Sequence, residues 1–204
     1  MAALLAERGV RVDPSTVYDW VREFAPLYED AARPFRRAVG SCWSVDETYT
    51  KIAGKSAYIY RAIDGHGQVV DVYVSQRRAT ADAAAFFQRA IAVTGVVPDE
   101  VTTDGAAAYP PALATALPPV LHATGKRVQQ RIARDHRHRK GRSRPTRGCK
   151  TLAGARVLCR GHAFLRNLRA GFYDLGRLVD GTILAPQPSV VRAWAALTSA
   201  LLGR

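Results

Sequence analysis

The chain has 204 residues, of which 48% are hydrophobic, and carries a formal net charge of +13 at pH 7. This length allows one sizeable core with a small appendage, and no apolar run is long enough to span a bilayer, so we expect no membrane partner. The three cysteines show no paired spacing and the first ten residues lack a signal-peptide core. We therefore expect a cytoplasmic protein without a disulfide framework.

The first predicted elements are two short helices that meet at Gly9. Residues 2–8 are typical of a helix, and a second helix is expected after Asp13, with Pro14 at its first position. Its apolar residues recur at helical spacing, so they form one stripe opposite a polar face. The stripe consists of Val17, Trp20, Val21 and Phe24, and the polar face includes Ser15, Thr16, Tyr18 and Arg22.

Two short helices of this kind are similar to the last two helices of a helix-turn-helix. We interpret residues 1–25 as a partial helix-turn-helix DNA-binding segment whose polar face contacts DNA. Because the first helix of a complete motif is missing, we expect the chain to be truncated at its N-terminus. The alternative is a plain helical hairpin that packs on the core.

A linker and a sheet are predicted next. Residues 26–41 contain two prolines and are interpreted as the linker. Alternating apolar and polar residues indicate an antiparallel meander, with strands at 42–52, 56–63 and 68–75. The following elements are a helix at 80–94, a strand at 101–103, a helix at 106–117, a strand at 120–123 and a mainly helical remainder.

The order βββαβαβα predicts an α/β fold of the ribonuclease-H-like kind, in which helices flank a mixed five-stranded sheet. We assign this domain to residues 42–176. Residues 177–204 are interpreted as a C-terminal tail that is mostly helical.

Two aspartates follow β-prone runs and are the first candidates for chemistry. Asp46 lies within the first predicted strand and Asp104 comes directly after a short one. If these strands are neighbours, the two carboxylates converge, and carboxylate oxygens are the ligands that Mg²⁺ prefers. The alternative reading is a pair of ordinary surface or turn aspartates.

A basic segment runs from Lys126 to Arg147, with ten basic residues and one acid, a net charge of +9. Such a density favours a polyanion such as DNA through counterion release. The alternative is a solvated charged face. The candidate DNA-binding residues here are Lys126, Arg127, Arg131, Arg134, Arg137, Arg139, Lys140, Arg142 and Arg144.

Three motifs resemble those of one known family. They begin VDETYT at Val45, VTTDGAAAYP at Val101 and TGKRVQQRIARDH at Thr124. In this order and spacing they look like the DDE transposases of bacterial and archaeal insertion sequences, of the IS6 family. The resemblance implies that Asp46 and Asp104 are the first two catalytic acids and hold two Mg²⁺ ions. It also implies DNA cleavage and strand transfer at terminal inverted repeats, a homodimer, and association with the nucleoid.

The third acid of that family, a glutamate on a helix, is replaced here by Ala133. Alanine offers no metal ligand, so we expect a copy impaired in catalysis. Glu47, adjacent to Asp46 on a strand, is expected to point to the opposite face and not to replace it. His136 lies on the same helical face as position 133, but a neutral imidazole does not mimic a charged oxygen ligand. The alternative function is a non-enzymatic, transposase-derived DNA-binding protein or a decayed fragment.

Overall fold

The computed structural model describes residues 5–7, 9–117, 119–125, 149–175 and 190–203. They form two compact units, one made of residues 38–167 and the other of residues 1–37 with 168–204. The larger unit contains a five-stranded sheet in the order β3-β2-β1-β4-β5. Its strands are β1 (Cys42–Ile52), β2 (Lys55–Asp64), β3 (Val69–Ser75), β4 (Glu100–Thr103) and β5 (Leu121–Thr124).

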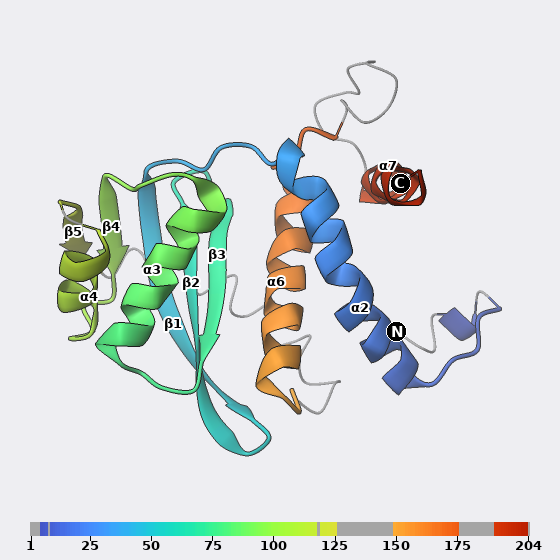
Figure 1. The fold of residues 1–204 in the computed structure, drawn as a ribbon, viewed down its shortest axis with the longest axis horizontal. Helices are drawn as coiled ribbons and strands as arrows, with labels where there is room; N and C mark the ends of the chain where they lie inside the picture. The colour runs from blue at the N-terminus through green and yellow to red at the C-terminus, as the bar shows by residue number, and fades with distance from the viewer. Residues whose placement is uncertain (1–4, 8, 118, 126–148, 176–189, 204) are drawn as a thin grey trace. The chain divides into compact units, whose positions relative to one another are not determined.

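The sheet is mixed. β1, β2 and β3 form an antiparallel meander, whereas β4 and β5 run parallel to β1. The β1–β2 hairpin closes through Ala53 and Gly54, both with positive φ, because a two-residue turn with this twist matches the twist of its strands. The predicted ribonuclease-H-like sheet flanked by helices is confirmed (Figure 1).

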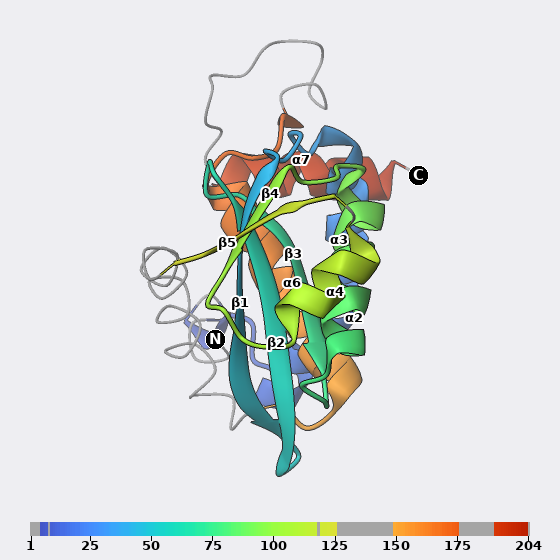
Figure 2. The same cartoon turned by 90° about the vertical axis from the view of Figure 1, so that its left-hand side faces the viewer.

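Helices cover both faces of this sheet. One face packs against α3 (Thr80–Thr94) and α4 (Tyr109–Ala116) through the larger core cluster, which includes Trp43, Val45, Tyr60, Phe86 and Phe87. The other face packs against α6 (Leu152–Arg169) through the smaller cluster, whose members include Ile59, Val72, Ala155 and Cys159. Figure 2 shows the first arrangement from the side. Side chains therefore alternate along β1 between the α3/α4 face and the α6 face.

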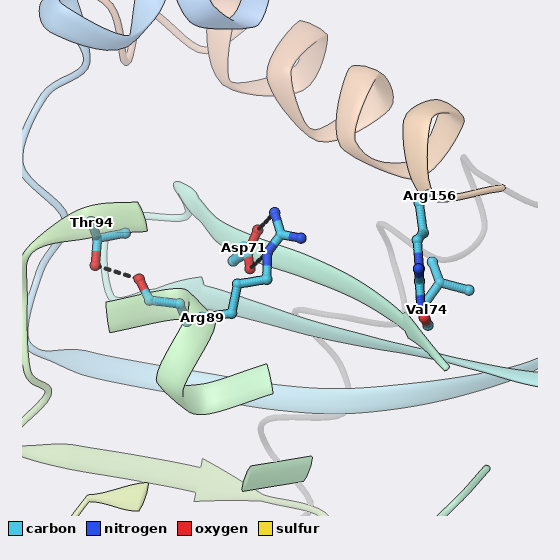
Figure 3. A network of polar contacts seen from close by, with 6 residues as sticks. Asp71, Val74, Arg89, Thr94 and Arg156 are labelled. Atoms are coloured by element: carbon cyan, nitrogen blue, oxygen red, sulfur yellow. Dashed lines mark hydrogen bonds and ion pairs between the residues drawn. The ribbon is translucent and has the colours of Figure 1, made fainter. Parts of the chain in front are cut away.

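Side chains from α6 form hydrogen bonds with backbone groups on the outer edge of β3. The Asn167 amide donates to the Val69 carbonyl and accepts from the Val69 N–H, both at 2.8 Å. Arg156 Nε donates to the Val74 carbonyl at 3.3 Å (Figure 3). On the other face of the sheet, Arg89 of α3 forms an ion pair with the buried Asp71 at 3.0 Å. An edge strand presents unpaired backbone groups, and α6 supplies partners for several of them.

The smaller unit is built around α2 (Pro14–Ala32), which is followed by a 3-10 turn, η1 (Arg33–Phe35), and packs on α7 (Val190–Leu202). As predicted, Asp13 caps α2 and Pro14 occupies its first turn. Tyr28 contacts the Trp194 ring edge-on, with centroids 4.4 Å apart, and its hydroxyl hydrogen-bonds to Thr198 at 2.8 Å.

The prediction of a linker from residue 26 is wrong for its first part, because α2 continues through Pro26 to Ala32. The prolines suggested a break, yet a proline inside a helix removes only one backbone hydrogen bond and adds local strain. The packing of Tyr28 against α7 and the burial of Ala31 and Ala32 compensate for that loss. The apolar stripe of α2 is only partly covered, since Trp20, Val21 and Phe24 are exposed.

Candidate functional site

The two aspartates singled out in the sequence lie close together, Asp46 on β1 and Asp104 just after the neighbouring strand β4. β1 and β4 pair in parallel, and Ser44 lies opposite Thr102. Asp46 lies two residues beyond Ser44, and Asp104 lies two residues beyond Thr102. Both aspartates are therefore the same number of residues from this register pair. Their carboxylates are close enough for the charge of Asp104 to raise the pKa of Asp46. The structure therefore brings the two predicted acids together.

Burial is the larger influence on Asp46. It raises the pKa of this carboxyl above its ordinary value, and the repulsion from Asp104 adds to the increase. The Glu47 N–H, which donates to Asp46 Oδ1 at 2.8 Å, acts in the opposite direction. A partly buried carboxylate beside a second one is a centre that a bound cation would stabilise.

A turn after β4 fixes the position of Asp104. Its Oδ1 accepts from the Ala106 N–H at 3.1 Å, and Gly105 has a φ of +83°, which an L side chain rarely adopts. The Thr103 hydroxyl accepts from the Gly105 N–H at 3.1 Å and contacts His122 Nε2 at 2.9 Å. His122 of β5 therefore supports the turn from the neighbouring strand.

Glu47 lies on the opposite face of β1 from Asp46, as the alternation predicted. Its register partner is Tyr60, and its carboxylate forms an ion pair with Arg78 from the turn between β3 and α3. Burial raises the pKa of Glu47, and the Arg78 guanidinium opposes that increase. No local pattern predicted this pair, because residues 47 and 78 are distant in the chain.

Two tyrosines lie buried beside these acids. Burial, with the charge of Glu47 second, raises the pKa of Tyr60 to about 12 and that of Tyr109 further still. The hydroxyls of both tyrosines have no hydrogen-bond partner among the described residues. Both rings belong to the core cluster under α3 and α4, on the same face of the sheet as Glu47.

The donor set fits a hard divalent cation but is incomplete in the described part of the chain. Two carboxylates, Asp46 and Asp104, are oxygen ligands of the kind that Mg²⁺ prefers. No group of three His, Cys, Asp or Glu side chains able to hold a metal occurs among the described residues. Ala133 lies outside them, as do His136 and the whole predicted basic segment, with Lys126, Arg127, Arg131, Arg134, Arg137, Arg139, Lys140, Arg142 and Arg144.

The predicted DNA-facing residues of the N-terminal segment all lie on α2, in its first three turns. Ser15 donates its hydroxyl and its N–H to Asp13 Oδ1, at 2.5 and 2.7 Å, so it belongs to the helix cap. Arg22 lies over the Tyr18 ring, 5.8 Å from its centroid, and 3.7 Å from the Asp19 carboxylate. Their role in DNA binding stays a prediction.

Comparison with known proteins decides the family. A family model described as a DDE domain, of the IS240 transposase type, matches residues 40–171. The chain belongs to this DDE domain family. The match spans β1 to α6 and thus includes both aspartates and position 133.

Curated relatives of this DDE domain come from Staphylococcus aureus. The transposase for insertion sequence-like element IS431mec is 41% identical over 148 residues, and the transposase for IS257 in transposon Tn4003 is 40% identical over the same length. Both alignments cover 70% of this chain, and the chain spans 65% of the length of each relative. The sequence resemblance to IS6-family transposases is confirmed.

Solved structures show a weaker similarity. The HTLV-2 integrase catalytic core domain in complex with magnesium matches with a TM-score of 0.40 and 18% identity, over 50% of this chain and 68% of that one. A simian T-cell lymphotropic virus intasome matches with a TM-score of 0.42 and 20% identity, over 50% of this chain and 39% of that one. These scores are too low to support conclusions about the site.

Proposed function

We propose that this chain is an insertion-sequence transposase of the DDE family that binds DNA and is impaired in metal-dependent strand cleavage and strand transfer. The observation that carries the proposal is the proximity of Asp46 on β1 and Asp104 just after β4, two residues beyond the register pair Ser44–Thr102. This pair lies within the matched DDE domain. The +9 segment that follows β5 in sequence supplies the charge for a DNA partner.

The chemistry would be phosphoryl transfer at this pair of acids. Asp46 and Asp104 would hold Mg²⁺, which when bound supplies Lewis-acid stabilisation of charge at a phosphate. The Glu47 N–H, by donating to Asp46 Oδ1, orients that carboxylate. The turn at Gly105 holds the second carboxylate at the same level of the sheet.

The proposed impairment follows from Ala133, where the family has a glutamate. Losing one ligand weakens the hold on the cation, and metal ions contribute several kcal/mol to transition states of this kind.

We propose that Ser15, Thr16, Tyr18 and Arg22 of α2 contact the terminal inverted repeats. A homodimer associated with the nucleoid in the cytoplasm would be the working form. None of the described helices is long and apolar enough to cross a membrane.

The test is a nicking and strand-transfer assay with Mg²⁺ or Mn²⁺ on DNA carrying an element end. The wild-type chain should bind this DNA and cut it very slowly. Ala133→Glu should increase the cutting rate by at least about tenfold, and Ala133→Gln, a matched neutral change, should not. Robust strand transfer by the wild type would contradict the impairment.

An additional variant tests the assignment of the acids. Asp104→Asn in the Ala133→Glu chain should abolish any gained cutting while leaving DNA affinity within about twofold of the wild type, because the change removes a cation ligand and little else. If DNA binding requires no cation and Ala133→Glu gains nothing, the protein is instead a non-enzymatic DNA-binding derivative of a transposase.

A further inference from the structure

A strip of side chains runs along the α3/α4 face of the β1–β2 hairpin and starts at Glu47, on the opposite face of β1 from Asp46. Cross-strand register places three pairs along it in succession. They are Glu47 with Tyr60, Tyr49 with Tyr58, and Lys51 with Ser56. In Figures 1 and 2 this hairpin extends past the ends of α3 and α4. The outer part of the strip is therefore left uncovered, and Tyr49, Lys51 and Ser56 are exposed.

The end of the strip nearest the aspartates presents an arginine. The Glu47 side chain is only 8% exposed, whereas Arg78, its ion-pair partner, is 48% exposed. The acid is thus hidden beneath a guanidinium that faces outward. A guanidinium has five N–H donors in a fixed fork, so donors remain for a phosphate while the ion pair holds the group in place.

The middle of the strip presents an aromatic ring. Tyr49 is 52% exposed, and it touches the Tyr58 ring edge-on, with centroids 5.9 Å apart. Its hydroxyl lies 3.4 Å from the Ser56 hydroxyl. These contacts support one edge of the ring and leave much of its surface open. A ring held in this way offers a stacking platform for an unpaired base at little further cost in side-chain entropy.

We propose that this strip binds one unpaired DNA strand, with Arg78 and Lys51 on phosphates and Tyr49 stacked on a base. The alternation of cation, aromatic ring and cation is the pattern that single strands require, because every base has a π-face and every linkage a charge. The strip begins at Glu47, which lies on the other face of β1 from Asp46 but within electrostatic range of both Asp104 and Asp46, so a strand held there passes near the acids. The inference rests on the proposed function and adds a substrate contact to it.

The experiment compares full-length variants by fluorescence anisotropy on a labelled unpaired oligonucleotide of mixed sequence and on its duplex. Tyr49→Ala should lower affinity for the unpaired strand by at least about fivefold and leave duplex affinity within about twofold. Tyr49→Phe keeps the ring and should bind like the wild type. Arg78→Ala should reduce the salt slope on the unpaired strand by about 0.7, and Arg78→Lys should restore it.

Two control variants match these changes away from the strip. Val97→Ala removes an exposed apolar side chain, and Arg33→Ala removes an exposed arginine that is ion-paired with Asp30. Neither should change binding to either DNA. As a second measurement, photo-crosslinking to a strand substituted with 5-bromouracil should label the peptide that contains Tyr49.

The outcomes distinguish a failure of the proposed function from a failure of the strip assignment. If the wild type binds neither form of DNA, the proposed function fails and the strip assignment fails with it. If it binds DNA but Tyr49→Ala keeps its affinity for the unpaired strand, or loses the same factor on the duplex, the strip assignment alone is overturned. Crosslinks confined to other peptides would also overturn it.

Discussion

At the scale of single residues, the two acidic side chains of β1 lie on opposite faces of the strand and have different charged neighbours. Asp46 lies on the α6 face beside Asp104, and Glu47 lies on the α3/α4 face beneath Arg78. Adjacent strand residues thus serve two different environments. One carboxylate has a like-charged neighbour, which opposes its ionisation, and the other has an arginine, which favours its ionisation.

Asp46→Asn should stabilise the folded chain at pH 7 when no divalent cation is present. Burial, together with Asp104, raises the folded pKa of Asp46 above 3.8, so ionising this group costs stability above the folded pKa. The penalty disappears as the pH falls through the raised pKa, so the advantage of the variant should shrink toward pH 3.8. Thermal unfolding across this pH range measures the effect. Asp99→Asn, at an exposed aspartate, is the charge-matched control.

Arg78→Ala should destabilise the fold by about 1–3 kcal/mol, because it leaves the buried Glu47 carboxylate without its cation. Arg33→Ala, which breaks an exposed pair, should cost less than about 1 kcal/mol. Adding Glu47→Gln to Arg78→Ala should recover part of the loss, since no buried charge then remains. Urea unfolding of the four chains gives these differences, and equal losses for the two arginines would contradict the argument.

At the scale of elements, the sequence predicted the strands well because each has a clear apolar face or a marked turn. The meander and the helix that ends at Gly95 are where the pattern placed them. The extent of α2 was wrong because Pro26 is a local signal, whereas its compensation by Tyr28 and Trp194 comes from residues far apart in the chain. The Glu47–Arg78 pair was missed for the same reason. Asp46 and Asp104 follow strand patterns, but two such aspartates are a weak signal alone, and the family resemblance of their motifs decided the assignment.

Asn167→Leu should destabilise the larger unit by about 2 kcal/mol or more. The change leaves both the N–H and the carbonyl of Val69 without the partners that the amide supplies, and each unsatisfied buried group costs about 1–3 kcal/mol. Arg156→Ala removes a single contact to the Val74 carbonyl and should cost about 1 kcal/mol or less. Urea unfolding ranks the two variants, and a smaller loss for Asn167→Leu would show that water replaces the amide.

At the scale of the whole molecule, charge is concentrated outside the described sheet. The segment from Lys126 to Arg147 carries +9 of the net +13. Counterion release makes DNA affinity depend on salt with a slope of about 0.9 per phosphate contacted on duplex DNA. The basic segment should therefore govern the salt dependence of duplex binding, whereas the hairpin strip governs the preference for unpaired strands.

Replacing Arg137, Arg139 and Lys140 together by glutamine should reduce the salt slope on duplex DNA by up to about 2.7, with each lost phosphate contact contributing about 0.9. A triple change of Arg33, Arg37 and Arg169 to glutamine removes the same charge elsewhere and should leave the slope unchanged. Affinity measured over a series of salt concentrations provides the comparison. Equal salt slopes for the two triple variants would show that the net charge of the protein, and not the basic segment, determines the salt dependence.

The amide of Asn167 also has a bearing on self-association. By occupying the N–H and carbonyl of Val69, it closes that position of the β3 margin to a visiting strand. Among the described strands, β5 forms the opposite margin of the sheet. A variant without this amide would expose unpaired backbone groups at the β3 margin. Sheets with two exposed edges can polymerise, whereas sheets with one can only pair.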